Sequence, residues 1–273
     1  MFDLLQELFS YPFVVRALLV GTLVALCASL LGVSLVLKRY SMIGDGLSHV
    51  GFGTLALAMA MNLGPLEVSI PLMLLAAFLL LRVSENSRIK GDAAIALISS
   101  SSLAIGVVII AMTSGMNADL CNYMFGTILA MSTSDLYLSV AVASIVLILY
   151  IIFYNKIFLV TFDEGFAKAT GTKTSYYNML IAFLTALIIV IGMRMMGAML
   201  ISSLIIFPAL TSMRIFRSFK SVVISSAILS VFCFFMGIVI SFTISTPAGA
   251  SVVIVNLAAF CLFTLAAFIR KAV

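Results

Sequence analysis

The sequence predicts an all-α protein, a polytopic membrane helix bundle with about nine transmembrane helices. Of its 273 residues, 64% are hydrophobic and only 9% are charged, and the mean hydropathy is +1.30. Polar side chains are therefore too scarce to cover a water-soluble globule. The apolar segments run without charge for close to the roughly 20 residues that a helix needs to cross a bilayer, whereas barrel strands would be about ten residues long. A bundle of spanning helices fits both observations.

Nine apolar segments between the charged residues are the candidate spans. The third is the weakest, because only 14 residues separate Glu67 from Arg82 and Pro71 interrupts them, so eight spans are the alternative. A further run, 120–134, is too short and too rich in Asn, Gly, Ser and Thr to cross, and it predicts one non-spanning or re-entrant helix. The candidate spans are 17–37, 40–62, 64–81, 93–113, 136–155, 174–192, 196–213, 222–244 and 249–269.

The basic residues support nine spans independently, because the Lys and Arg bias of short loops sets the orientation of a membrane protein. With nine spans, 13 of the 15 basic residues fall on one side and only Arg16 and Arg194 on the other. The N-terminus is therefore expected outside and the C-terminus inside, and the net charge of +5 reflects this sidedness, with no nucleic-acid partner implied. The thirteen are Lys38, Arg39, Arg82, Arg88, Lys90, Lys156, Lys168, Lys173, Arg214, Arg217, Lys220, Arg270 and Lys271.

The only histidine, His49, lies four residues after Asp45 inside an apolar span. In a helix, residues i and i+4 share one face, so a carboxylate and an imidazole can reach the same cation. Ionisable groups inside a bilayer are costly and by default mark an ion or substrate pathway. A rise of about 1.5 Å per residue from Tyr40 carries His49 roughly 15 Å inward, near the middle of a bilayer of about 30 Å. The alternative reading is a helix-capping Asp and a hydrogen-bonded core His.

A carboxylate with a neutral imidazole suits divalent ions such as Mn²⁺, Fe²⁺ and Zn²⁺, so Asp45 and His49 are the predicted metal ligands. The ion would be a transported substrate, and no intrinsic cofactor is expected. Two ligands are too few for tight coordination. A symmetric dimer would offer up to four and still allow release.

The longest basic loop, 156–173, is expected to lie in the cytoplasm within a single transmembrane domain that covers residues 1–273. Acidic residues at Asp163 and Glu164, followed by Gly171, predict a brief helix with a glycine stop. The loop lacks the Gly-x-x-x-x-Gly-Lys pattern of a phosphate-binding loop. The chain is therefore expected to have no ATPase site of its own and not to be an enzyme.

Other classes remain open at this point. An ion-coupled secondary transporter or a channel fits the same hydropathy, although such a protein needs coupling residues, and beyond Asp45 and His49 almost all charges lie at span ends. An intramembrane enzyme fits less well, because His-Glu-x-x-His is absent and a single histidine limits Ser-His schemes.

Five segments, taken in order, resemble the ABC-3 family of permeases, the zinc, manganese and iron importers of bacteria. The resemblance runs over nearly the whole chain. The segments are Gly44-Asp45-Gly46-Leu47-Ser48-His49, Asp92-Ala93-Ala94-Ile95-Ala96, Asn122-Tyr123-Met124-Phe125-Gly126-Thr127-Ile128-Leu129, the Asp163 to Gly171 loop, and Gly197-Ala198-Met199-Leu200-Ile201 through Pro208-Ala209.

This resemblance implies a permease in the bacterial cytoplasmic membrane, surrounded by lipid and paired with a second permease copy, either identical or related. It implies two cytoplasmic ATP-binding subunits and an extracytoplasmic solute-binding protein that delivers the ion. Asp45 and His49 match the family's acidic and histidine positions on the translocation path. A short cytoplasmic helix of such permeases docks into the ATPase, and the residues here that occupy its place are Asp163, Glu164, Gly165, Phe166, Ala167 and Gly171.

Overall fold

The computed structural model describes residues 12–86, 91–113 and 133–272, and within these ranges the chain forms eleven α-helices and no strand. The expected non-spanning helix at 120–134 falls almost entirely outside the described residues. The helices are α2 (Pro12–Leu37), α3 (Ser41–Ala60), α4 (Pro65–Asn86), α5 (Gly91–Thr113), α7 (Thr133–Ile152), α8 (Tyr154–Phe162), α9 (Glu164–Ala169), α10 (Thr174–Met196), α11 (Ala198–Met213), α12 (Phe219–Ile244) and α13 (Ala248–Ala272).

Nine of these helices coincide with the nine expected spans, and seven of them are long and apolar enough to cross a membrane. The two that fall short of that standard are α11, with 16 residues, and α3, which carries Asp45 and His49. Helices suit such apolar segments because their backbone groups are satisfied within the segment itself.

Several helices differ in extent from the sequence expectation; for example, α2 begins at Pro12 where 17 was expected, and α7 covers 133–152 where 136–155 was expected. The doubtful third span forms a continuous helix of 22 residues, α4, which contains Pro71 and continues past Arg82. The long aliphatic stem of an arginine allows its charge to reach the interface while the helix goes on. Helix α10 extends to Met196, beyond the expected end at 192, and a single residue, Gly197 with φ of 84°, separates it from α11.

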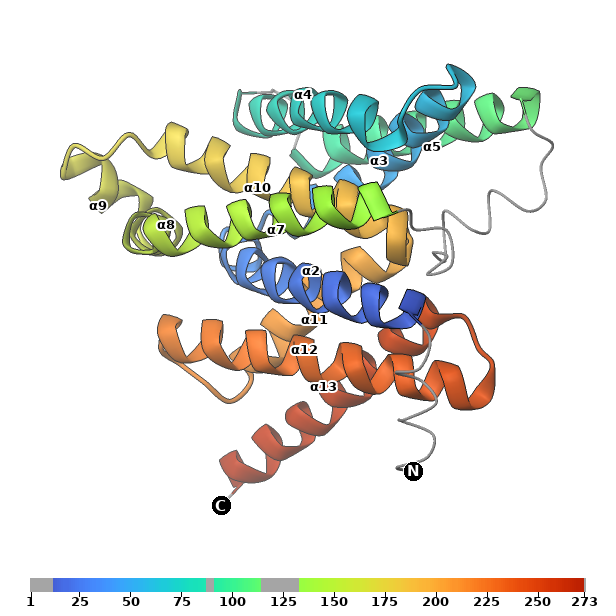
Figure 1. Ribbon diagram of the computed structural model, residues 1–273. Coiled ribbons are helices and arrows are strands. Elements are labelled where there is room, and N and C mark those ends of the chain that lie inside the picture. Colours follow the sequence, from blue (N-terminus) through green and yellow to red (C-terminus); the bar gives the residue numbers. More distant parts are fainter. Residues whose placement is uncertain (1–11, 87–90, 114–132, 273) are drawn as a thin grey trace.

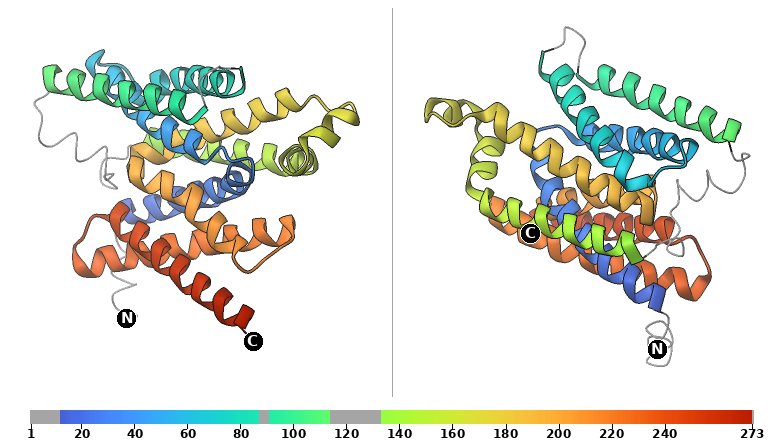
Figure 2. Two further views of the ribbon diagram at one scale, coloured as in Figure 1. Left: turned by 180° about the vertical axis from the view of Figure 1, so that it is seen from behind. Right: turned by 45° about the horizontal axis from the view of Figure 1, so that its top comes forward.

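The buried centre of the bundle consists of α2, α10 and α11, with α3, α4 and α5 on one side and α12 and α13 on the other (Figures 1 and 2). Helix α13 diverges from the bundle towards its C-terminal end. Its outer face and that of α5 carry large exposed apolar side chains, among them Phe268 and Met112. A bilayer or another membrane subunit would cover such surfaces.

Close helix contacts depend on small residues, as is usual in membrane bundles. A Cβ added to Gly32 on α2 would lie 1.9 Å from the backbone oxygen of Ile205 on α11. The hydroxyl group of Ser230 on α12 donates to the carbonyl of Ala25 on α2 at 2.9 Å. These contacts hold the backbones of α2, α11 and α12 closer together than larger side chains would permit.

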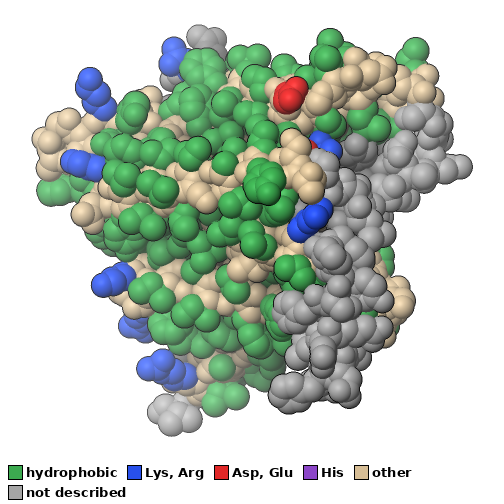
Figure 3. Space-filling view, in the orientation of Figure 1, with side chains coloured by type: hydrophobic (Ala, Val, Ile, Leu, Met, Phe, Trp, Pro, Cys, Tyr) green, Lys and Arg blue, Asp and Glu red, His purple; other side chains and the backbone are tan. Residues whose placement is uncertain are grey.

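The two ends of the bundle differ in charge. The nine helices that coincide with the expected spans alternate in direction along the chain. The basic residues near α8 and α9 therefore lie at one end of the molecule, where Lys and Arg side chains gather in Figure 3. Arg16, near the start of α2, and Arg194, in the last turn of α10, belong to the opposite end. The charge asymmetry expected from the sequence is therefore an asymmetry of the folded bundle.

Candidate functional site

Asp45 and His49 lie on one face of α3, as expected from their i, i+4 spacing. His49 Nε2 is 3.8 Å from Asp45 Oδ2, and the two side chains are 31% and 43% exposed. All the remaining residues from Ile43 to Val50 are buried. The helix therefore turns two ionisable side chains outwards from an otherwise packed segment.

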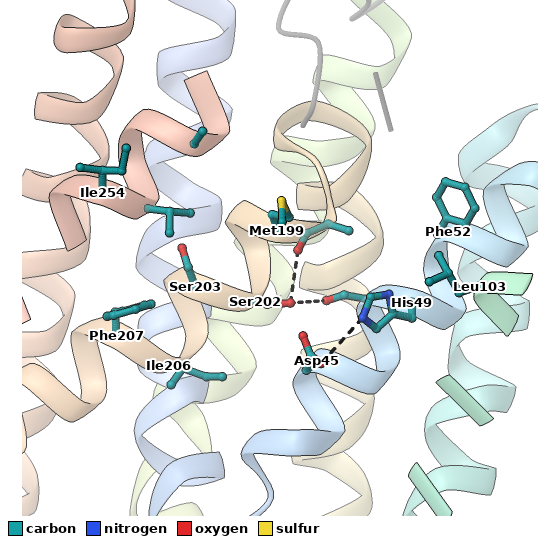
Figure 4. A pocket seen from close by; sticks show the side chains of 14 residues that line it. Asp45, His49, Phe52, Leu103, Met199, Ser202, Ser203, Ile206, Phe207 and Ile254 are labelled. Carbon is teal, nitrogen blue, oxygen red and sulfur yellow. Dashed lines mark hydrogen bonds and ion pairs between the residues drawn. The ribbon is translucent and has the colours of Figure 1, made fainter. Parts of the chain in front are cut away.

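Both side chains point into a cavity of about 590 Å³ (Figure 4). One wall is formed by α3 and by Leu103 of α5, and the other by α11 and α13. Most of the lining is aliphatic or aromatic, including Ile206 and Ile254. The polar lining residues are Asp45, Ser48, His49, Ser202 and Ser203.

Two hydroxyl groups connect the walls of the cavity between Asp45 and His49. Ser48 donates to the carbonyl of Gly44 at 3.0 Å, and Ser202 of α11 lies 3.0 Å from the Ser48 oxygen. Ser202 is also 3.2 Å from the carbonyl of Ala198, one turn earlier in its own helix. The sequence analysis did not identify Ser202. The serine pair inside the apolar span 196–213 is the signal that could have indicated a polar position there.

The cavity offers few ligands from one chain. In residues 12–86, 91–113 and 133–272, no group of three or more His, Cys, Asp or Glu side chains could hold a metal ion. A carboxylate and an imidazole can contact a divalent cation but leave most of its coordination positions to water or another chain. Such a site favours brief binding over permanent retention.

The expected short helix is present at the basic end of the bundle, where α8 leads directly into α9. Asp163 caps α9 by accepting a hydrogen bond of 2.9 Å from the backbone N–H of Phe166. Gly171 adopts φ of 77° after the helix. The N–H groups of Gly171 and Thr172 donate to the carbonyls of Lys168 and Ala167, respectively. This is the glycine stop that the sequence predicts.

Residues 163–171 divide into a packed side and an exposed side. The side chain of Ala167 is fully buried, whereas Phe166 is 57% exposed. Gly165 is exposed, and Glu164 is only partly so. The exposed aromatic ring of Phe166 therefore lies beside small residues on the outer side of the segment. We call residues 163–171 the docking segment.

Glu164 joins the docking segment to the bundle through two lysines. Its carboxylate lies 3.3 Å from Lys38 Nζ and 3.0 Å from Lys168 Nζ. Burial alone would raise the pKa of Glu164, but the hydrogen bonds and positive charges of Lys168 and Lys38 outweigh it and lower that pKa below its usual value. The sequence analysis missed Lys38 because it precedes Glu164 by 126 residues.

The structure thus brings Asp45 and His49 together in the cavity, and it brings Asp163, Glu164, Gly165, Phe166, Ala167 and Gly171 together in the docking segment. The two groups do not meet, since none of the docking residues lines the cavity. The two groups therefore occupy separate parts of the bundle.

Comparison with known proteins adds an independent line of evidence. The model of the ABC 3 transport family matches residues 10–268. The chain is 30% identical over 254 residues to the manganese import system permease protein ScaB of Streptococcus gordonii, with 93% of this chain and 91% of that protein covered. It is 33% identical over 256 residues to the high-affinity zinc uptake system membrane protein ZnuB of Haemophilus influenzae, with 93% and 97% covered.

A solved structure is similar as well. The structure of PsaBC from Streptococcus pneumoniae in complex with Fab aligns with a TM-score of 0.86 at 30% identity, over 96% of this chain and 94% of that chain. The similarity extends over nearly all of the bundle, including the helices that form the cavity.

Proposed function

Since the chain belongs to the ABC 3 transport family, we propose that it is the membrane-spanning permease subunit of an ATP-driven importer of a divalent transition-metal ion. Mn²⁺, Zn²⁺ and Fe²⁺ are the candidate substrates. The single observation that carries this function is the projection of Asp45 and His49 from one face of α3 into a largely apolar cavity. The names of the manganese and zinc permeases that this chain resembles support the same substrate class.

The metal site is completed by a second permease copy. Two chains related by a two-fold axis would bring two Asp45 carboxylates and two His49 imidazoles to a shared path, with up to four side-chain ligands. Oxygen and neutral nitrogen donors suit Mn²⁺, Fe²⁺ and Zn²⁺. Protein ligands from two chains can separate when the chains move, which allows the ion to leave. The partner copy is either identical or a related permease.

The docking segment is where movement of the ATP-binding subunits is transmitted to the permease. The ATP-binding subunits contact residues 163–171 at the basic end of the bundle, and closure of these subunits on ATP rocks the two permeases so that the cavity opens alternately to each face. An extracytoplasmic solute-binding protein delivers the ion at the opposite end. This chain therefore contributes the path and the binding residues, and the separate subunits supply ATP hydrolysis.

The basic end of the bundle is cytoplasmic, in keeping with the positive-inside rule. The N-terminus then lies outside the cytoplasmic membrane of a bacterium and the C-terminus inside, with nine helices as spans. Helix α11, although short at 16 residues, borders the cavity and completes the alternation of directions.

Uptake by purified protein tests this proposal. The chain is reconstituted in proteoliposomes with its ATP-binding subunit and solute-binding protein, and ATP-dependent uptake of Mn²⁺, Zn²⁺ and Fe²⁺ is measured separately. We expect Asp45→Asn and His49→Gln each to reduce uptake of the transported ion by at least about tenfold, since each removes one of the two proposed metal ligands of this chain.

Glu67→Gln is the matched control, because it neutralises an exposed carboxylate in the first turn of α4, outside the cavity. It should leave uptake within about twofold of the unmodified rate, as surface substitutions generally have small effects. Uptake that continues without ATP would instead identify a secondary transporter or a channel. Unchanged uptake in both cavity variants would show that Asp45 and His49 are not the metal ligands.

A further inference from the structure

Lys38 is an unusual lysine, because its side chain is only 6% exposed although it lies at the basic end of the bundle. Its ammonium group donates to the carbonyl of Val160 near the end of α8 at 3.0 Å and contacts Glu164 Oε2 at 3.3 Å. It also lies 5.7 Å from the centre of the Tyr40 ring. Burial of an ammonium group is costly unless such partners compensate for lost hydration.

Lys38 lies directly before α3, the helix that carries Asp45 and His49. Helix α2 ends at Leu37 and α3 begins at Ser41, so Lys38 lies in the short turn between them. The backbone N–H groups of Arg39 and Tyr40 bond back to the last turn of α2, with Arg39 at φ of 59°. This hydrogen-bonded turn is compact, and Lys38 lies only three residues before the start of α3.

The distance from this turn to the metal site is short. Asp45 and His49 lie in the first three turns of α3, and His49 is roughly 12 Å along the helix from Ser41 at about 1.5 Å per residue. A helix transmits an axial shift or a rotation at its start over such a length. The movement of α3 would also change the contact between Ser48 and Ser202 across the cavity.

The surroundings of Lys38 explain why it can transmit movement. It borders a small cavity of about 10 Å³ that is shared by α2, α3, α4 and α10, which leaves space for a single water molecule at most. Because the ammonium group has protein groups around it, it cannot change partners as freely as a solvated lysine. Lys168, the second lysine on the same carboxylate, is 65% exposed and has that freedom.

We propose that Lys38 is a positioning residue that transmits movement of the docking segment to α3 and thereby to Asp45 and His49. Glu164 connects Lys38 to α9, and the carbonyl of Val160 connects it to α8. The inference rests on the proposed function, since it concerns how that transport is coupled to ATP hydrolysis.

The test measures metal uptake and ATP hydrolysis in the same proteoliposomes, which contain the complete complex with its ATP-binding subunit and solute-binding protein. The metal is the one of Mn²⁺, Zn²⁺ and Fe²⁺ that the unmodified complex transports. We expect Lys38→Met to lower the number of ions transported per ATP by about fivefold or more, within the range of typical coupling energies, while ATP hydrolysis continues. Lys38→Arg keeps the charge and should recover most of the ratio.

Lys220→Met is the matched control, because Lys220 is an exposed lysine at the same end of the bundle and lies outside the docking segment. Its ratio should equal that of the unmodified complex. A double-mutant cycle with Glu164→Gln isolates the ion pair. The combined Lys38→Met and Glu164→Gln variant should have a ratio no lower than the more severe single variant, because both changes remove the same contact.

Each outcome separates the inference from the proposed function. If the unmodified complex transports none of the three metals, the proposed function is wrong. If it transports one of them and Lys38→Met retains the normal ratio, or loses uptake and hydrolysis in equal proportion, Lys38 has no role in coupling. Should Lys38→Met fail to assemble, the ratio in Lys38→Gln decides instead, because this change removes the positive charge while its amide group can still donate to the carbonyl of Val160.

Discussion

The hydroxyl group of Ser202 on α11 lies 3.0 Å from the hydroxyl group of Ser48 on α3, so a side-chain hydrogen bond crosses the cavity wall between Asp45 and His49. Ser48 is almost fully buried and donates its own proton to the carbonyl of Gly44. Its oxygen therefore accepts from Ser202. The rotation of α3 about its axis, which sets the direction of both ionisable side chains, depends in part on this contact.

Removal of the Ser202 hydroxyl group should loosen α3. We expect Ser202→Ala to lower the free energy of unfolding by about 1 kcal/mol, the typical contribution of a hydrogen bond whose loss leaves a buried oxygen without its donor. Thermal unfolding in detergent measures the effect. Ser203→Ala is the control, since Ser203 donates within its own helix to Leu200. An equal loss in both variants would show that the contact between helices contributes nothing.

The contact between α2 and α11 should not tolerate a methyl group. A Cβ at Gly32 would lie 1.9 Å from the backbone oxygen of Ile205, and a backbone atom cannot rotate away. We expect Gly32→Ala to destabilise the protein by about 3 kcal/mol or more, because the two helices must separate. The midpoint of thermal unfolding is the measurement.

Gly44→Ala provides a comparison at the same residue, Ile205. The added Cβ at Gly44 would lie 3.6 Å from the side chain of Ile205, which is ordinary contact. Alanine is also the better helix former, so this variant should be neutral or more stable by up to about 1 kcal/mol. If the two alanine variants unfold at the same temperature, the close approach of α2 and α11 is wrong.

The effects of mutations at Asp135 on α7 and Arg194 on α10 on stability should be coupled. The two side chains form an ion pair of 2.8 Å and are only 14% and 23% exposed. Arg194→Met should cost about 2–4 kcal/mol, since it removes the oppositely charged side chain from beside a largely buried carboxylate. Adding Asp135→Asn should restore part of this loss. Arg16→Met, which removes a positive charge near the same end, should cost less than about 0.5 kcal/mol. Additive losses in the double variant would exclude the coupling.

The docking segment should lose its ion pair in acid. The pKa of Glu164 in the folded protein lies below its usual value of 4.5 because the two lysines favour the charged form. The resulting stabilisation is complete above about pH 4.5 and disappears as the pH falls through the lowered pKa. It should amount to no more than about 1 kcal/mol, since Glu164 is partly exposed.

Thermal unfolding of the unmodified protein and of Glu164→Gln, followed from pH 6.5 down to about pH 3.5, measures this contribution. The difference between the two midpoints should be constant at the higher pH values and shrink below about pH 4.5. A difference that grows as the solution becomes more acidic would mean that Glu164 is stabilised in its protonated form instead.

The helices were largely predictable because their signals are local. Apolar runs near 20 residues indicated α12 and α13, and the acidic start with a glycine stop indicated α9 and Gly171. The spacing of Asp45 and His49 predicted that they share a face, since helical periodicity alone decides this. The expected ends were less accurate where Arg82 and Arg194 lie inside helices, because long side chains carry their charge away from the helix axis.

The contacts that complete both sites could not be predicted in the same way. Ser202 meets Ser48 from 154 residues away, and Lys38 meets Glu164 across 126 residues. No periodic pattern relates residues at such separations, because the packing of whole helices decides which faces meet. The number of basic residues at each end was readable from the sequence, but the burial of Lys38 among them was not.

The amino-acid sequence by itself determined the helical class, the alternation of basic loops and the pair of ionisable residues on one helix face, because hydropathy, charge and helical period act over a few turns. The tertiary structure decided that this face opens on a cavity, and that a buried lysine in the turn before the same helix contacts the docking segment. Those outcomes depend on how closely the backbones approach, which contacts such as that between Gly32 and Ile205 determine only once the helices are packed together.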